Sequence, residues 1–110
     1  MVVQTQNEKK NYKDGTIYIV PPFATARTLD DMEQRVKTEA SRLAINGLVV
    51  LTSQIYDNRK KDLRAIFRLG VKKMRQAQSV YLFKGWEHEP AARDLHRKAK
   101  KMRMGIQIEK

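Results

Sequence analysis

Four short apolar segments, separated by three stretches of helical periodicity, limit the possible folds of this chain most. The segments are TIYIV (16–20), LVVLT (48–52), SVYLF (79–83) and IQI (106–108). Their β-branched and aromatic residues are typical of strands. Strands joined by helical crossovers of this length run parallel, and right-handed crossovers place helices on both faces of the sheet. We therefore expect an α/β fold of the Rossmann- or flavodoxin-like type: a three-layer α/β/α sandwich with a four-stranded parallel sheet in the order 2-1-3-4.

The intervening helices carry start and stop signals. Thr28 can cap the first helix, and an Asn-Gly pair at 46–47 can end it. An apolar stripe over 63–74 predicts the second helix. Pro90 suits the first turn of the third helix, and we expect Gly105 to break it. The uninterrupted apolar run of the second strand is typical of a parallel strand covered on both faces.

The chain has the size of one domain. Its 110 residues can bury one modest core, and we expect a flexible arm over residues 1–15 and a single domain over residues 16–110. The arm lacks the apolar segment of a signal peptide, and no apolar run approaches the ~18 residues of a membrane span. Cysteine is absent, which excludes disulfides and thiolate chemistry. We therefore expect a soluble cytoplasmic protein that does not contact a membrane and needs neither a metal nor a cofactor.

The net charge is the strongest compositional signal. The chain has 23 Lys and Arg against 12 Asp and Glu, a formal charge of +11. Such a charge attracts polyanions, so RNA, DNA, a nucleotide or an acidic protein are the expected partners. The alternative is that the charge serves solubility alone.

The expected strand order reverses between the first and third strands. Ligands of open parallel sheets bind at this switch point, beyond the carboxyl ends of the strands. The flanking loops are PPFATAR (21–27) and KGWEHEP (84–90). From these loops the candidate ligand-binding residues are Pro22, Phe23, Arg27, Lys84, Gly85 and Trp86. Trp86 can stack on a base, or instead fill space at the sheet edge or face a second subunit.

The second loop also supplies titratable side chains. Glu87 and Glu89 are candidate catalytic carboxylates, since glycosidic chemistry uses paired carboxylates, and His88 can move protons near neutral pH. The alternative interpretation is that the two acids favour the positive end of the following helix and that His88 is a solvated loop residue.

Basic residues are concentrated in two further stretches. Candidate contacts to nucleic acid or another polyanion are Arg59, Lys60 and Lys61 before the second helix, and Arg97, Lys98, Lys100, Lys101 and Arg103 on and after the third. Cations that follow a phosphate backbone give sequence-independent, salt-dependent affinity. A solvated helix face is the alternative, and no specific nucleic-acid-binding motif accompanies these residues.

Four stretches together resemble a known family. They are IYI with its Pro-containing loop, RLAINGLVVL, SVYLFKGWE and AARDLHRKAKKMRMGIQI. The pattern is similar to the small nucleoside 2-deoxyribosyltransferase-like proteins, especially a short, mostly bacterial and phage branch of unknown function, and covers residues 16–108. In the wider family a Glu on the third helix attacks the anomeric carbon of the sugar and forms a covalent deoxyribosyl intermediate. The resemblance also implies a Gly-Pro that frames the substrate and small residues that open the third helix to a phosphate.

The chain departs from this pattern at the site itself. The corner at 85–87, Gly-Trp-Glu, matches the family. Glu89 replaces the expected Ser, an Ala pair at 91–92 replaces Gly-Ala, and Pro21 replaces the Gly of the first loop. Leu95 occupies the position of the nucleophilic Glu.

These replacements disfavour the family's chemistry. Pro90 has no amide to offer a phosphate, and Glu89 adds a negative charge in the same turn. Leu95 cannot form a glycosyl ester, and Asp94 is rotated by ~100° around the helix from that position.

Three functional hypotheses follow. The first is a non-catalytic nucleotide- or nucleic-acid-binding or interaction protein on a deoxyribosyltransferase-like fold. The alternative is an enzyme, a nucleoside deoxyribosyltransferase or nucleotide N-glycosidase, that cleaves the N-glycosidic bond of a deoxynucleoside or nucleotide with Glu87 or Glu89. The third is a protein that binds a host or partner protein. The resemblance also allows a homodimer.

Overall fold

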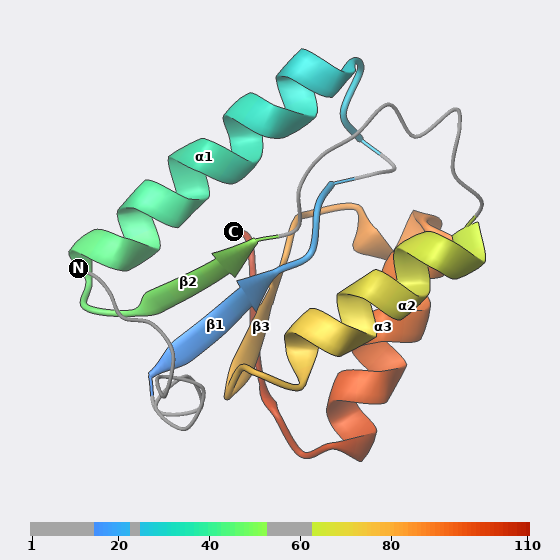
Figure 1. Cartoon of the computed structure of the whole chain (residues 1–110). Helices are drawn as coiled ribbons and strands as arrows, with labels where there is room; N and C mark the ends of the chain where they lie inside the picture. The colour runs from blue at the N-terminus through green and yellow to red at the C-terminus, as the bar shows by residue number, and fades with distance from the viewer. Residues whose placement is uncertain (1–14, 23–24, 53–62) are drawn as a thin grey trace.

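The four expected strands form one parallel sheet (Figure 1). A computed structural model describes residues 15–22, 25–52 and 63–110. The strands are β1 (Thr16–Ile19), β2 (Val49–Thr52), β3 (Ser79–Leu82) and β4 (Gly105–Ile108), in the order β2-β1-β3-β4. All three pairings are parallel. The predicted α/β class and strand order are therefore confirmed.

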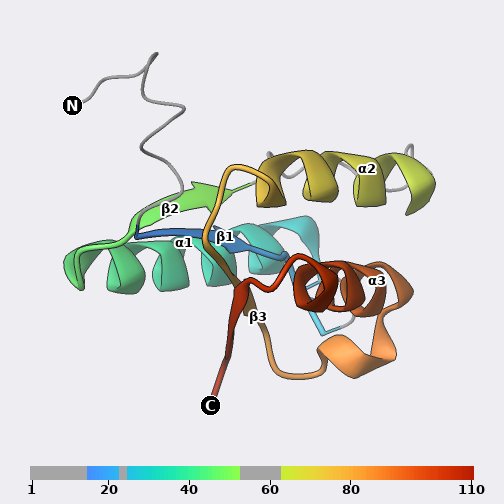
Figure 2. The same ribbon diagram turned by 90° about the horizontal axis from the view of Figure 1, so that it is seen from below.

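Helices cover both faces of the sheet. Helix α1 (Leu29–Ile45) lies on one face, and α2 (Leu63–Met74) and α3 (Pro90–Lys101) lie side by side on the other (Figures 1 and 2). A short 3-10 helix, η3 (Trp86–His88), joins β3 to α3. The result is the expected three-layer arrangement.

Two hydrophobic cores follow from the alternation of side chains along the strands. Ile17, Ile19 and Tyr81 face α1, whereas Tyr18 and Val80 face α2 and α3, and all five are at most 1% exposed. Tyr18 thus belongs to the core between the sheet and the helices α2 and α3.

Strand β2 is less covered than its sequence predicts. Position 49 of its Val-Val-Leu-Thr sequence is 45% exposed, and its central residues are half-buried. The reason is topological: β2 is the outer strand beside β1, so it has a neighbour on one side only. A continuous apolar run is thus compatible with an edge strand.

The amino ends of α1 and α3 use the expected sequence signals. The hydroxyl of Thr28 accepts a hydrogen bond from the amide of Asp31 at 3.0 Å. Pro90 is the first residue of α3, where its missing N–H leaves no helical hydrogen bond unmade.

The carboxyl end of α3 differs from the sequence expectation. Gly105 does not break the helix; it is the first residue of β4. The reversal occurs at Arg103, whose φ of +58° is left-handed, while the amide of Met104 donates to the carbonyl of Ala99 at 3.0 Å. This is a Schellman motif with an arginine at the position that glycine usually fills.

Candidate functional site

The loops after β1 and β3 meet at the carboxyl edge of the sheet. Ile19 pairs with Tyr81, so these strands deliver their loops to the same place. A small pocket with about 10 Å³ of free space, room for about one water molecule, lies there and will be called the switch-point pocket. Its wall is formed by the prolines at 21–22, residues 82–86, and Glu89 and Ala92 from the start of α3, among others.

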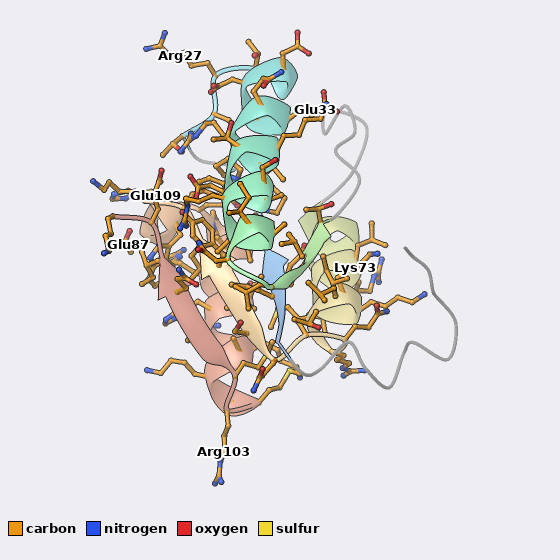
Figure 3. All side chains as sticks on the ribbon, turned by 90° about the vertical axis from the view of Figure 1, so that its left-hand side faces the viewer. Arg27, Glu33, Lys73, Glu87, Arg103 and Glu109 are labelled. Atoms are coloured by element: carbon orange, nitrogen blue, oxygen red, sulfur yellow. The ribbon has the colours of Figure 1, made fainter. Side chains whose placement is uncertain are left out.

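Four of the candidate ligand-binding residues line this pocket, namely Pro22, Lys84, Gly85 and Trp86. Phe23 lies outside the described residues. Arg27 is not part of the wall: its side chain is exposed and extends away from the molecule (Figure 3), and its backbone amide donates to Asp31 at 3.0 Å. The structure therefore brings the two loops together without Arg27.

Gly85 is required by the closeness of the two loops. Its φ is +95°, and a Cβ added to it would lie 2.6 Å from the Cγ2 atom of Thr25. Both the backbone conformation and the contact exclude a side chain. The Gly of the Gly-Trp-Glu corner is thus explained by loop packing.

Trp86 is held by a ring contact. Its indole stacks on the imidazole of His96, with ring centroids 4.2 Å apart and an interplanar angle of 29°. Burial lowers the pKa of His96, and the nearby charge of Lys100 lowers it further. A neutral imidazole therefore supports one face of the half-buried indole, which also packs on the core and lines the pocket.

The three candidate catalytic residues have different positions. Glu87 and His88 are exposed in η3 and are not part of the pocket wall. Glu89 is part of the wall, and its Oε1 atom accepts the amide hydrogen of Ala91 at 2.9 Å as the N-cap of α3. The capping role favours the structural interpretation of this carboxylate.

Leu95 belongs to the core between the helices. Its side chain is 1% exposed and is not part of the pocket wall. A Cβ added to Gly70 of α2 would lie 3.0 Å from the Cδ1 atom of Leu95. The position that the resemblance assigns to a nucleophile is therefore filled by an apolar contact between α2 and α3.

A second hollow adjoins the switch-point pocket and will be called the α1 hollow. It is an open hollow with about 250 Å³ of free space between Gln34, Arg35, Thr38 and Glu39 of α1 and the side chains of Phe83 and Glu109. Phe83 lines both hollows. Sequence reasoning missed this hollow, although the first turns of a helix that follows a strand lie near the carboxyl edge of a parallel sheet.

Arg35 links the two hollows. One terminal nitrogen donates to the hydroxyl of Thr25 at 2.8 Å, and the other lies 3.8 Å from Oε1 of Glu109. Its Cζ atom lies 5.2 Å from the ring centroid of Phe83. The same Glu109 oxygen accepts the amide hydrogen of Lys84 at 2.9 Å. These contacts fix a guanidinium that has five N–H donors, and its side chain is 27% exposed.

Glu39, in the wall of the α1 hollow, connects β3 to α1 through one carboxylate oxygen. Its Oε1 atom accepts hydrogen bonds from the hydroxyl of Tyr81 at 3.0 Å and from Nε of Arg42 at 2.8 Å. Burial, followed by the hydrogen bond to Glu39, raises the pKa of Tyr81 to about 12. These contacts give Glu39 a structural role between β3 and α1.

The predicted polyanion contacts that the structure describes belong to α3 and the turn after it, and α3 lies on the face of the sheet opposite α1. Arg97, Lys100, Lys101 and Arg103 are exposed and Lys98 is half-buried, on and just after α3. The other predicted stretch, at 59–61, lies outside the described residues. Within the described part of the chain, no group of three or more His, Asp or Glu side chains is placed to hold a metal ion.

The sheet and its loops define an open parallel α/β protein with a small pocket at its topological switch point and the larger α1 hollow beside it. The chain belongs to the family described as Domain of unknown function (DUF4406), whose model matches residues 16–108. Neither the curated proteins nor the solved structures gave a match to it. None of the helices in the described ranges has the length and apolar character needed to cross a lipid bilayer. The family description names no activity, so the likeness to nucleoside deoxyribosyltransferases stays a prediction.

Proposed function

We propose that this protein binds a nucleotide at the carboxyl edge of its sheet and does not cleave it. The observation that carries the proposal is Arg35, a guanidinium held over the ring of Phe83 at the α1 hollow. Fixed cations of this kind suit phosphate recognition, because the planar fork matches phosphate oxygens. The absence of cysteine suits the reducing cytoplasm, where we place the protein.

The base of the nucleotide is assigned to the mouth of the switch-point pocket. The half-buried ring of Trp86 offers apolar surface there, and the exposed Lys84 lies on the same loop. The interior of the pocket has only about 10 Å³ of free space, which is room for about one water molecule. A planar ring would therefore lie over the mouth, against Trp86, with the rest of the ligand in the direction of the α1 hollow, which has about 250 Å³ of free space.

The phosphate is assigned to the Arg35 side of the pocket. The amino end of α3 is unsuitable, because Pro90 has no amide and the carboxylate of Glu89 already caps the helix. Arg35 contacts Phe83, which lines both hollows, and the donors that it does not use for Thr25 and Glu109 are assigned to the anion. This arrangement would replace the helix amides of the resembled family with an arginine.

Two observations support the absence of cleavage. Leu95 fills the position of the nucleophile and faces α2. Glu89 holds the end of α3 through its hydrogen bond to Ala91. The second candidate function, cleavage of an N-glycosidic bond, is favoured by one fact: Glu89 is a carboxylate in the pocket wall.

The proposal is tested by titrating the protein with a nucleoside and with its 5′-monophosphate. Trp86 is the single tryptophan of the chain, so its fluorescence reports binding directly. We expect the monophosphate to bind about tenfold more tightly or better, since a hydrogen bond to a charged group contributes ~1.5–3 kcal/mol. Arg35→Gln should remove this preference. Lys37→Gln, which deletes an exposed cation two residues along α1, should retain it.

Two results would contradict the proposal. One is the absence of any fluorescence change with nucleotides at millimolar concentration. The other is an unchanged preference for the monophosphate in Arg35→Gln.

A further inference from the structure

The excess positive charge of the described chain is on one side of the sheet. Helix α1 has four acidic and three basic residues, whereas α3 has five basic residues and a single acidic one, Asp94. Helix α2 has basic residues and no acidic one. Since α2 and α3 cover the same face of the sheet, their charges add on that side (Figures 1 and 2).

Six cations on these helices define what will be called the basic face. They are Arg68, Lys72 and Lys73 of α2 and Arg97, Lys100 and Lys101 of α3. Five of them are exposed and Lys73 is half-buried. Residues such as 68 and 72, or 97 and 101, are one helical turn apart, so cations recur along each helix at intervals of about 6 Å.

Few carboxylates neutralise the basic face. Asp94 forms an ion pair with Arg97 at 3.0 Å. Among residues 68–101, all of which the structure describes, Arg97 is the one cation with a carboxylate this close. The remaining charges are available to a partner.

The two helices are held at a fixed distance. Gly70 allows α2 to approach α3 so closely that an added Cβ would lie 3.0 Å from Leu95. The basic face is therefore a rigid surface formed by two helices.

Arg103 extends the basic face beyond the end of α3. Its φ of +58° is unfavourable for a residue with a side chain, and glycine would relieve the strain. The side chain projects into solvent past the helix (Figure 3). The Schellman motif accounts for this backbone conformation, and the exposed side chain adds one more cation at the end of the basic face.

We propose that the basic face binds the phosphodiester backbone of a nucleic-acid duplex without reading its sequence. Cations along two packed helices can neutralise several phosphates at once, which gives salt-dependent affinity. A single strand is less suitable, because its binding sites stack bases on exposed aromatic rings. Among the described aromatic side chains, Tyr18, Tyr81 and Phe83 are buried, and the half-buried Trp86 belongs to the switch-point pocket and not to the basic face. This inference is independent of the nucleotide site, which lies at the edge of the sheet.

The test is fluorescence anisotropy with the full chain and a labelled duplex of 20 base pairs, at 50 to 200 mM salt. The variant is Lys100→Gln/Lys101→Gln on α3. The matched control, Arg27→Gln/Lys37→Gln, removes two exposed cations on the α1 side. We expect the slope of log K against log salt to become shallower by about two units in the first variant, at ~0.9 per phosphate contact. The control should keep the slope of the unmodified protein.

Further binding measurements distinguish a nucleic-acid duplex from other possible partners. DNA and RNA duplexes, and duplexes of unrelated sequence, should bind with similar affinity if the backbone is recognised. Three results would overturn the inference: equal loss of slope in the variant and the control, no binding to duplexes at 50 mM salt, or binding to anionic phospholipid vesicles without binding to duplexes.

Discussion

The contact between Gly70 and Leu95 predicts a large effect of one methyl group. A Cβ at position 70 would lie 3.0 and 3.1 Å from the two methyl carbons of Leu95, closer than the ~3.5–4.0 Å at which carbon atoms normally pack. Overpacking costs about 1–3 kcal/mol, and replacing a helical glycine by alanine gains about 1 kcal/mol. We therefore expect Gly70→Ala to lower the free energy of unfolding by between zero and about 2 kcal/mol.

The sign should reverse once the leucine is shortened. Leu95→Ala alone should cost about 2–5 kcal/mol, because the residue is 1% exposed and its removal leaves a cavity. In that background Gly70→Ala has no methyl groups to meet, so it should stabilise by about 1 kcal/mol. The double-mutant cycle therefore gives a coupling energy of about 1–3 kcal/mol.

Urea unfolding followed by far-UV circular dichroism measures all four proteins. Equal effects of Gly70→Ala on the free energy of unfolding in both backgrounds would contradict a steric contact between position 70 and Leu95. Leu95 would then not be the residue that fixes the distance between α2 and α3.

The other expected effects concern helix ends and one histidine. Arg103→Gly should raise the free energy of unfolding by about 1 kcal/mol in the same urea assay, because glycine tolerates the left-handed backbone; a loss of stability would contradict the Schellman assignment. Glu89→Ala should lower the free energy of unfolding by about 1 kcal/mol, because the amide of Ala91 loses its cap. Glu89→Ser should retain most of the stability, since serine is also a good N-cap residue. Equal losses of stability in the two variants would count against the capping role. On acidification, the fluorescence of Trp86 should change with a midpoint below 6.5, the ordinary pKa of His96, and this change should be absent in His96→Gln. Because the unfolded chain takes up this proton first, stability should fall as pH drops below about 6.5, and a midpoint above 6.5 would contradict the burial of the imidazole.

Much of the fold follows from local patterns in the sequence. The helix starts near Thr28 and Pro90 are set by capping chemistry, which depends on nearby residues. The parallel order 2-1-3-4 follows from crossover length and handedness. The end of α3 could not be predicted from such local patterns. Gly105 is the obvious helix breaker in the sequence, whereas the chain reverses at Arg103, two residues before β4 begins.

The sequence predicts the position of the candidate site better than the residues and contacts that form it. The topological switch indicates the loops that carry Pro22 and Trp86, and both line the pocket. Arg35 could not be assigned from the sequence, since its role depends on contacts with Thr25 and Glu109, which are distant along the chain. The same holds for the buried contact of Leu95, whose partner comes from another helix. The proposed contacts at 59–61 and Phe23 stay predictions.

Binding of a nucleotide without cleavage is tested by a prolonged incubation of stoichiometric protein with a panel of 2′-deoxynucleosides and their 5′-monophosphates, followed by chromatography for free base. We expect every nucleoside and nucleotide to be recovered intact, while the fluorescence of Trp86 reports that the monophosphates are bound. Release of free base that is abolished by Glu89→Gln would show that the protein is an enzyme instead.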